Sequence, residues 1–120
     1  RVLVVEDDED AATTLSTLLV YRGCEVRIAH SVREALDLFQ SWNPDVMLCD
    51  IGLPDGDGCA LLRQVRELMP ERLVPAIALS AFAREEDRTR AASVGFELYV
   101  TKPFEVEELI DHIRQVAKAG

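Results

Sequence analysis

The sequence predicts an α/β fold in which a parallel sheet carries helices on both faces. Five short runs rich in Val, Ile, Leu and Ala alternate with segments of helical periodicity, and the runs are 2–5, 25–29, 45–49, 75–79 and 98–101. Near-continuous apolar runs are typical of parallel strands that are buried on both faces. Strict alternation of strands and helices then requires right-handed crossovers between neighbouring strands.

The first helix is predicted by an apolar face, and Gly23 just beyond it is a natural stop because glycine adopts the left-handed conformation of a helix end. That face carries Ala11, Leu15, Leu18 and Leu19. The second helix begins after Ser31, which forms a capping-box pattern with Glu34. We expect Trp42 to pack at the end of this second helix.

Three more helices are predicted over about 58–69, 84–94 and 105–118. Asp57 is the expected N-cap of the first of these, which turns Leu61, Leu62, Val65 and Leu68 inward. The 84–94 segment is much more polar than the others, so we expect it to be one of the less stable elements.

Length and charge narrow the possible functions. A chain of 120 residues is enough for one domain, and no apolar run approaches the ~18 residues of a membrane helix. The net charge of −9 disfavours direct nucleic-acid binding. Three cysteines without metal spacing indicate a reducing setting, and we expect buried thiols and a cytoplasmic location. Because the chain starts at Arg1, we expect a fragment of a larger protein.

Polar side chains follow four of the five predicted strands. Glu6 and Asp7 follow the first strand, Asp50 the third, Ser80 the fourth and Lys102 the fifth. The carboxyl ends of parallel strands meet at one edge of a sheet, which is where open α/β sheets bind ligands. Taken singly, these residues could be an acidic helix start, a turn residue, a strand-end hydroxyl and a surface lysine. Together they predict a functional site.

Four segments of the chain resemble the receiver domain of two-component response regulators. They are Val4–Asp8, Asp50–Pro54 with Gly56 and Gly58 behind it, Leu79–Ala81, and Tyr99–Phe104. The resemblance covers essentially the whole chain, which implies a single receiver domain over residues 1–120. It also implies a flavodoxin-like, doubly wound sheet of five strands in the order 2-1-3-4-5 with five helices.

The resemblance implies that Asp50 accepts a phosphoryl group from the phosphohistidine of a histidine kinase or a histidine phosphotransfer domain. An aspartate can act as a nucleophile and hold an acyl phosphate. Three crowded carboxylates repel one another, and a divalent cation would remove that repulsion. The expected cofactor is Mg²⁺ (or Mn²⁺), and the resemblance implies a metal site made by Glu6, Asp7, Asp50 and Gly52. Asp7, Asp50 and the main-chain carbonyl of Gly52 would ligate the cation, and Glu6 would hold a water bound to it.

Further roles are implied by the same resemblance. Lys102 would neutralise phosphoryl oxygens, and its peptide bond to Pro103 would be cis. Ser80 would donate a hydroxyl to the phosphoryl group, and Tyr99 would turn inward to switch the face formed by the fourth helix, fifth strand and fifth helix. That face could also support a weak homodimer. Gly52 and Phe82 replace side chains that could orient water, so we expect slow self-dephosphorylation.

Several alternatives remain open at this point. A degenerate receiver would act as an interaction module without phosphorylation. A phosphatase of the haloacid-dehalogenase type needs Asp-x-Asp, which Asp50-Ile51-Gly52 lacks, and a flavin-binding module would want a Ser/Thr/Gly-rich loop after the first strand. The domain catalyses at most its own phosphorylation and dephosphorylation. It could belong to a hybrid histidine kinase, as the cytoplasmic part of a membrane-bound sensor.

Overall fold

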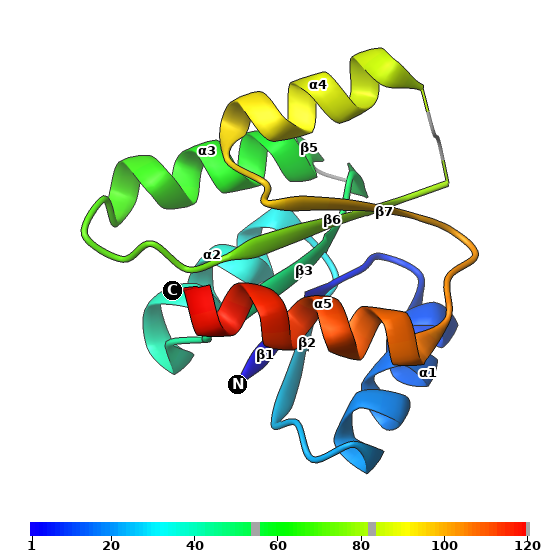
Figure 1. Cartoon of the computed structure of the whole chain (residues 1–120). Coiled ribbons are helices and arrows are strands. Elements are labelled where there is room, and N and C mark those ends of the chain that lie inside the picture. Colours follow the sequence, from blue (N-terminus) through cyan, green and yellow to red (C-terminus); the bar gives the residue numbers. More distant parts are fainter. Residues whose placement is uncertain (54–55, 82–83, 120) are drawn as a thin grey trace.

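A single parallel sheet forms the centre of the molecule, with its strands in the order β2-β1-β3-β6-β7 (Figure 1). The structure is a computed structural model that describes residues 1–53, 56–81 and 84–119. The strands are β1 (Val2–Val5), β2 (Val26–Ala29), β3 (Val46–Asp50), β6 (Ala76–Ser80) and β7 (Leu98–Thr101). They follow one another in the predicted order 2-1-3-4-5, so the flavodoxin-like topology is confirmed.

Within the described residues, five helices cover the two faces of this sheet (Figure 1). They are α1 (Glu9–Tyr21), α2 (Val32–Trp42), α3 (Gly58–Leu68), α4 (Glu85–Val94) and α5 (Val106–Ala119). Helices α1 and α5 pack on one face, and α2, α3 and α4 pack on the other. None of the helices in the described ranges is long and apolar enough to cross a membrane.

The central strands contribute side chains to two separate cores. On β1, Leu3 and Val5 belong to the core under α2 and α3, whereas Val2 and Val4 belong to the core under α1 and α5. Successive side chains of a strand point to opposite faces. Because both faces are covered by helices, every residue of β1 is buried, which explains the unbroken apolar runs of the sequence.

The predicted helix caps at three positions are confirmed. Gly23 has a φ of 93° and follows the C-cap of α1. The Ser31 hydroxyl accepts the Glu34 N–H at 3.2 Å, and the Glu34 carboxylate accepts the N–H of His30, one residue earlier than the capping box expects. Asp57 Oδ1 accepts the Ala60 N–H at 2.7 Å, so Asp57 is the N-cap of α3.

Three apolar residues expected to face inward are exposed. Leu18 and Leu68 are 40% and 57% exposed, and Ala11 is exposed while its neighbour Ala12 is buried. Leu68 is the last residue of α3, where the helix leaves the sheet. Leu18 lines a groove between α1 and the start of α5.

The loop after Asp50 contains a short hairpin that the sequence pattern does not predict. Strands β4 (Gly52–Leu53) and β5 (Gly56–Asp57) pair antiparallel, with Gly52 opposite Asp57. Two-residue strands are too short to show any periodicity. Two of the three cysteines, Cys49 and Cys59, are buried as expected, and Cys24 is half-buried.

Candidate functional site

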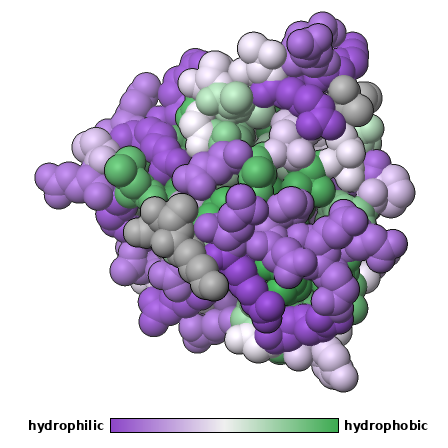
Figure 2. Space-filling model, in the orientation of Figure 1, coloured by the Kyte–Doolittle hydropathy of each residue, from purple (hydrophilic) through white to green (hydrophobic). Residues whose placement is uncertain are grey.

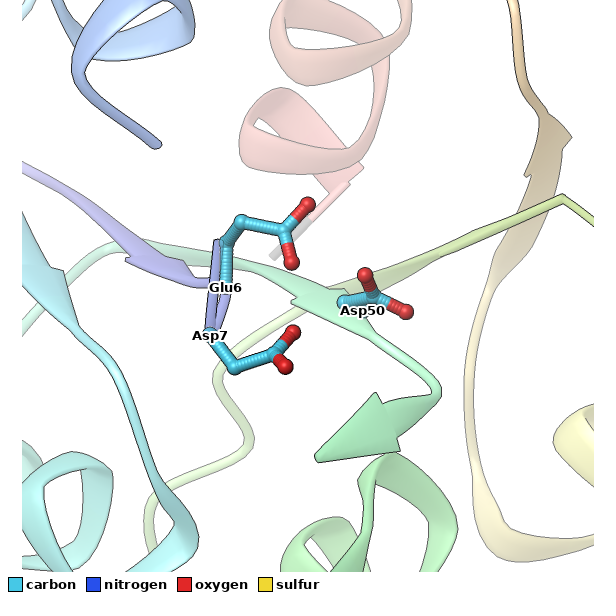
Figure 3. A group of neighbouring side chains, drawn as sticks. All are labelled: Glu6, Asp7 and Asp50. Carbon is cyan, nitrogen blue, oxygen red and sulfur yellow. The ribbon is translucent and has the colours of Figure 1, made fainter. Parts of the chain in front are cut away.

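Three carboxylates converge at the carboxyl edge of the sheet. Strands β1 and β3 are parallel neighbours with Val5 opposite Cys49, so the residues that follow Val5 lie beside Asp50. One oxygen from each of Glu6, Asp7 and Asp50 lies within 4.8 Å of the others. Figure 3 shows the three carboxylates turned toward a common space. The structure thus brings together the acids that the sequence places at two strand ends.

Lys102 bridges two of these carboxylates from the end of β7. Its Nζ donates to Glu6 Oε1 and to Asp50 Oδ2, each at 2.9 Å. Its backbone N–H donates to the Ser80 carbonyl at 2.8 Å, and its peptide bond to Pro103 is cis, as the resemblance implies. Burial alone would lower the pKa of Lys102, but the hydrogen bonds to the two carboxylates outweigh it and raise this pKa.

Both carboxylate oxygens of Asp50 accept hydrogen bonds. Oδ2 accepts from Lys102, and Oδ1 accepts from the backbone N–H of Gly52 at 3.0 Å. The Asp50 side chain is 16% exposed, so it is fixed in direction yet still open to solvent. This combination suits a nucleophile that an external donor must reach.

Glu6 is the most buried acid of the group, with its side chain 8% exposed. Burial is the main cause that raises its pKa to about 7, and the hydrogen bond and negative charge of Asp50 add to this effect, against the opposing influence of Lys102. The contribution of Asp50 shows that the neighbouring carboxylates repel one another, so the group has excess negative charge when all its members are ionised. A hard divalent cation with oxygen ligands would remove that excess.

The residues at this edge fit magnesium. Mg²⁺ is held by carboxylate and carbonyl oxygens and keeps several of its waters. Asp7 is exposed and Asp50 is partly exposed, which leaves a side of the carboxylate group open for water. All three side-chain candidates offer oxygen atoms.

Ser80 lies on β6, the strand next to β3, and Tyr99 lies on β7, the next strand along. Ser80 ends β6, is 3% exposed, and stands opposite Thr101 in the parallel pairing with β7. Tyr99 lies in the middle of β7 and is half-buried, with the Arg88 guanidinium 4.9 Å from its ring centre. Phe82, the other position expected to influence dephosphorylation, lies outside the described residues.

A groove of about 450 Å³ runs from the carboxylates along the space between α1 and the start of α5. Its walls are mostly apolar, and Glu6 and Lys102 are among its polar lining residues. The apolar lining consists of Ala11, Leu15, Leu18, Leu79, Pro103, Phe104 and Val106. The exposure of Ala11 and Leu18 follows from this groove, although the sequence gives no sign that their side of α1 is left open.

Two side chains near the site had no predicted role there. His30 Nδ1 lies 3.0 Å from the carbonyl oxygen of Glu6, so His30 contacts the backbone of the segment that carries Glu6 and Asp7. Arg90 of α4 pairs with Asp57 at 2.6 Å, although Asp57 was expected only to cap α3. Both contacts join residues far apart in the chain, and single residue types carry no signal of such packing.

The comparison with known families decides the class of the domain. Residues 2–114 match the sequence profile of the response regulator receiver domain. The chain belongs to the receiver domain family. Receiver domains are phosphoacceptor switches that work with histidine kinases or phosphotransfer proteins, and they bind Mg²⁺ at an acidic pocket.

Individual relatives agree with this assignment. The chain is 42% identical over 118 residues to an uncharacterized 14.6 kDa protein of Leptolyngbya boryana and covers 90% of it. It is 39% identical to the transcriptional regulatory protein TrcR of Mycobacterium tuberculosis, aligning over 95% of this chain but only 44% of TrcR. Among solved structures, the receiver domain of the Francisella response regulator 1452 superposes with a TM-score of 0.90 at 33% identity, covering 98% of this chain and 96% of that one.

Proposed function

We propose that Asp50 is the phosphoacceptor of this receiver domain and takes its phosphoryl group from the phosphohistidine of a histidine kinase or a histidine phosphotransfer domain. The observation that carries the proposal is the position of the Asp50 carboxylate. It is held by Lys102 and Gly52 and lies beside Glu6 and Asp7. Phosphoryl transfer needs mainly positioning and charge neutralisation, which this set supplies.

Glu6, Asp7, Asp50 and the main-chain carbonyl of Gly52 are the proposed holders of Mg²⁺ (or Mn²⁺). When bound, the cation supplies positive charge to the phosphoryl oxygens. Asp7 and Asp50 would ligate it directly, and Glu6 would hold one of its waters. Lys102 adds a second positive charge from the protein itself.

In the proposed reaction, a carboxylate oxygen of Asp50 forms a bond to phosphorus as the P–N bond of the donor phosphohistidine breaks. The electron pair of that bond leaves with the imidazole nitrogen, and the product is an acyl phosphate on Asp50. As negative charge passes from the Asp50 carboxylate to the phosphoryl oxygens, the Lys102 ammonium would exchange its bond to the carboxylate for one to these oxygens. The Ser80 hydroxyl, at the end of the neighbouring strand, then donates to the phosphoryl group.

The switch proposed for this domain uses Ser80 and Tyr99. A phosphoryl group adds about −1.5 to −2 charges and several strong acceptors. Ser80 would move toward it, and Tyr99 would turn inward beside β7 to fill the space. The face formed by α4, β7 and α5 would then change, and it is the proposed output surface and the site of a weak homodimer.

The setting of the domain is also a proposal. Residues 1–120 form one receiver domain that we assign to a longer cytoplasmic signalling protein, for example a hybrid histidine kinase. A receiver that signals without phosphorylation is disfavoured because Lys102 contacts both Glu6 and Asp50, which keeps the carboxylate pair together. Outside its own phosphorylation and dephosphorylation, we assign no catalytic activity.

Intact-mass spectrometry after incubation with acetyl phosphate tests this proposal. With Mg²⁺ present, the wild type should gain about 80 Da, the mass of one phosphoryl group. The Asp50→Asn variant and the wild type in excess chelator should gain nothing. If the wild type gains no mass from acetyl phosphate or from a purified histidine kinase donor, Asp50 is not a phosphoacceptor. A gain retained by Asp50→Asn would place the group elsewhere.

A further inference from the structure

Helix α4 has little apolar anchoring. Ala91 is its one buried residue, and its N-cap residue Arg84 makes no side-chain capping hydrogen bond. In Figure 2 the surface over α4 is mostly hydrophilic. A helix buries apolar surface to stay in place, so contacts made by its charged side chains matter more for α4 than for its neighbours.

One of these charged contacts reaches the loop that carries Asp50. Arg90 Nη2 lies 2.6 Å from Asp57 Oδ2, and Asp57 is the residue paired with Gly52 in the β4–β5 hairpin. Burial alone would raise the pKa of Asp57, but the Ala60 N–H and the Arg90 guanidinium outweigh it and lower this pKa. The carboxylate is therefore ionised and engaged on both oxygens.

Hydrogen bonds in turn connect the hairpin and the start of α3 to the segment of Asp50 and Ile51. The Gly52 N–H donates to Asp50 Oδ1 at 3.0 Å, and the Gly58 N–H donates to the Ile51 carbonyl at 2.8 Å. A displacement of Asp57 would thus move Gly52, whose N–H orients Asp50. Packed or hydrogen-bonded elements of this kind can pass a displacement from one site to another.

A second arginine of α4 contacts Tyr99, the aromatic residue of the proposed switch. Arg88 lies two residues before Arg90, and its guanidinium sits 4.9 Å from the ring centre of Tyr99 on β7. A cation over an aromatic face is attracted electrostatically to the ring. Helix α4 therefore contacts both the hairpin beside Asp50 and the aromatic residue of the proposed switch.

We propose that Arg90 is a positioning residue that couples α4 to the β4–β5 hairpin through Asp57, and that Arg88 extends this coupling to Tyr99. A change at Asp50 that shifts the hairpin would loosen or move α4, and a partner bound to α4 would alter the hairpin. This reciprocity is a thermodynamic necessity for coupled sites. The signalling meaning of the coupling depends on the proposed function, but the coupling itself does not.

Amide hydrogen exchange on the unphosphorylated protein, followed by NMR, tests the coupling without any donor or metal. The variants are Arg90→Gln, Asp57→Asn and their combination. Asparagine caps helices as well as aspartate does, so Asp57→Asn removes the charge and keeps the cap. The matched control is Arg114→Gln, which removes an exposed arginine from α5. The readouts are the amides of α4 and the amide of Gly58, which is bonded to the Ile51 carbonyl.

We expect Arg90→Gln and Asp57→Asn to speed exchange both in α4 and at Gly58, by about two- to fivefold, the range of a partly exposed ion pair. The double variant should exchange no faster than either single variant, because the same contact is lost. Arg114→Gln should leave both readouts at the wild-type rates. Faster exchange in α4 with an unchanged Gly58 would reduce the pair to a local surface bridge and overturn the coupling. Unchanged exchange at both places would overturn it as well.

A calorimetric titration with Mg²⁺ gives a second readout. If the hairpin positions the carbonyl of Gly52, then Arg90→Gln should weaken Mg²⁺ binding by at least about twofold relative to Arg114→Gln. A wild type that neither binds Mg²⁺ nor gains phosphoryl mass would refute the proposed function. The exchange measurement would still decide the coupling in that case.

Discussion

At the scale of single residues, the site is built from side chains whose positions follow from the strand ends. Glu6, Asp50 and Lys102 could be predicted to meet because each follows a buried parallel strand, and parallel strands end at one edge. The contacts of His30 and Arg90 could not be predicted in this way. They depend on how a loop or a helix packs against an element distant in sequence, and no local pattern encodes that packing.

Gly52 allows a test of the expected slow dephosphorylation. A Cβ at Gly52 would meet no atom within 4 Å, and its backbone does not need glycine, so Gly52→Asn should fold normally. The added amide could orient a water toward the acyl phosphate of Asp50. We expect the phosphorylated half-life to shorten, by less than the ~10²-fold that a general base typically contributes. Decay of the phosphorylated mass with time measures it.

Gly52→Ala is the control, because its methyl group cannot hold a water and the half-life should stay close to that of the wild type. A wild-type half-life equal to or shorter than that of Gly52→Asn would contradict the expectation.

At the scale of elements, strand and helix identity could be predicted well because both faces of the sheet are covered. The continuous apolar runs became β1, β3 and β6, and the polar 84–94 segment became the weakly anchored α4. The inward faces of α1 and α3 were predicted too broadly, since Leu18 and Leu68 are exposed. Periodicity gives the direction of an apolar face but does not show whether a neighbour covers all of it.

The close approach of the first residue of α3 to the end of β3 gives a prediction at this scale. A Cβ at Gly58 would lie 2.8 Å from the Asp50 carbonyl oxygen and 2.9 Å from Cys49 Sγ. In open space, Gly→Ala usually stabilises a protein by about 0.4–1 kcal/mol, whereas overpacking costs about 1–3 kcal/mol. We therefore expect Gly58→Ala to lower the free energy of unfolding by about 1–2 kcal/mol and to slow phosphorylation of Asp50. Urea denaturation and acetyl phosphate labelling measure the two effects.

The double variant Cys49→Ala/Gly58→Ala removes one of the two close contacts and should recover part of the stability lost, relative to Cys49→Ala alone. An increase in the free energy of unfolding for Gly58→Ala would contradict the prediction, because it would show that the Asp50 backbone can move to make room for the methyl group without destabilising the protein.

At the scale of the whole molecule, two surfaces flank the carboxylates. The apolar groove between α1 and α5 has Glu6 and Lys102 in its lining, so it lies beside the carboxylates. The α4–β7–α5 face shares helix α5 with this groove and is largely hydrophilic, with smaller hydrophobic areas (Figure 2). Helix α5 therefore borders both the groove and the proposed output face.

The proposed homodimer is a prediction at this scale. With Mg²⁺ and beryllofluoride, a phosphoryl mimic, we expect sedimentation velocity to detect association at about 100 μM, near −5.5 kcal/mol. Tyr99→Ala should weaken this association because it alters the middle of the α4–β7–α5 face. Leu18→Asp, on the α1 side, should leave it unchanged. A monomer at all concentrations, or a dimer lost in Leu18→Asp but kept in Tyr99→Ala, would contradict this arrangement.

The shortage of buried residues in α4 has a consequence for how such domains diversify. Since Ala91 is its one buried residue, most side chains of α4 contribute little to the free energy of unfolding. Substitutions there, outside Arg88 and Arg90, could change the surface that a partner contacts while the two cores and the carboxylates stay as they are. Duplicated copies of this domain could then come to bind different partners through changes in one helix, while they keep the same proposed chemistry at Asp50.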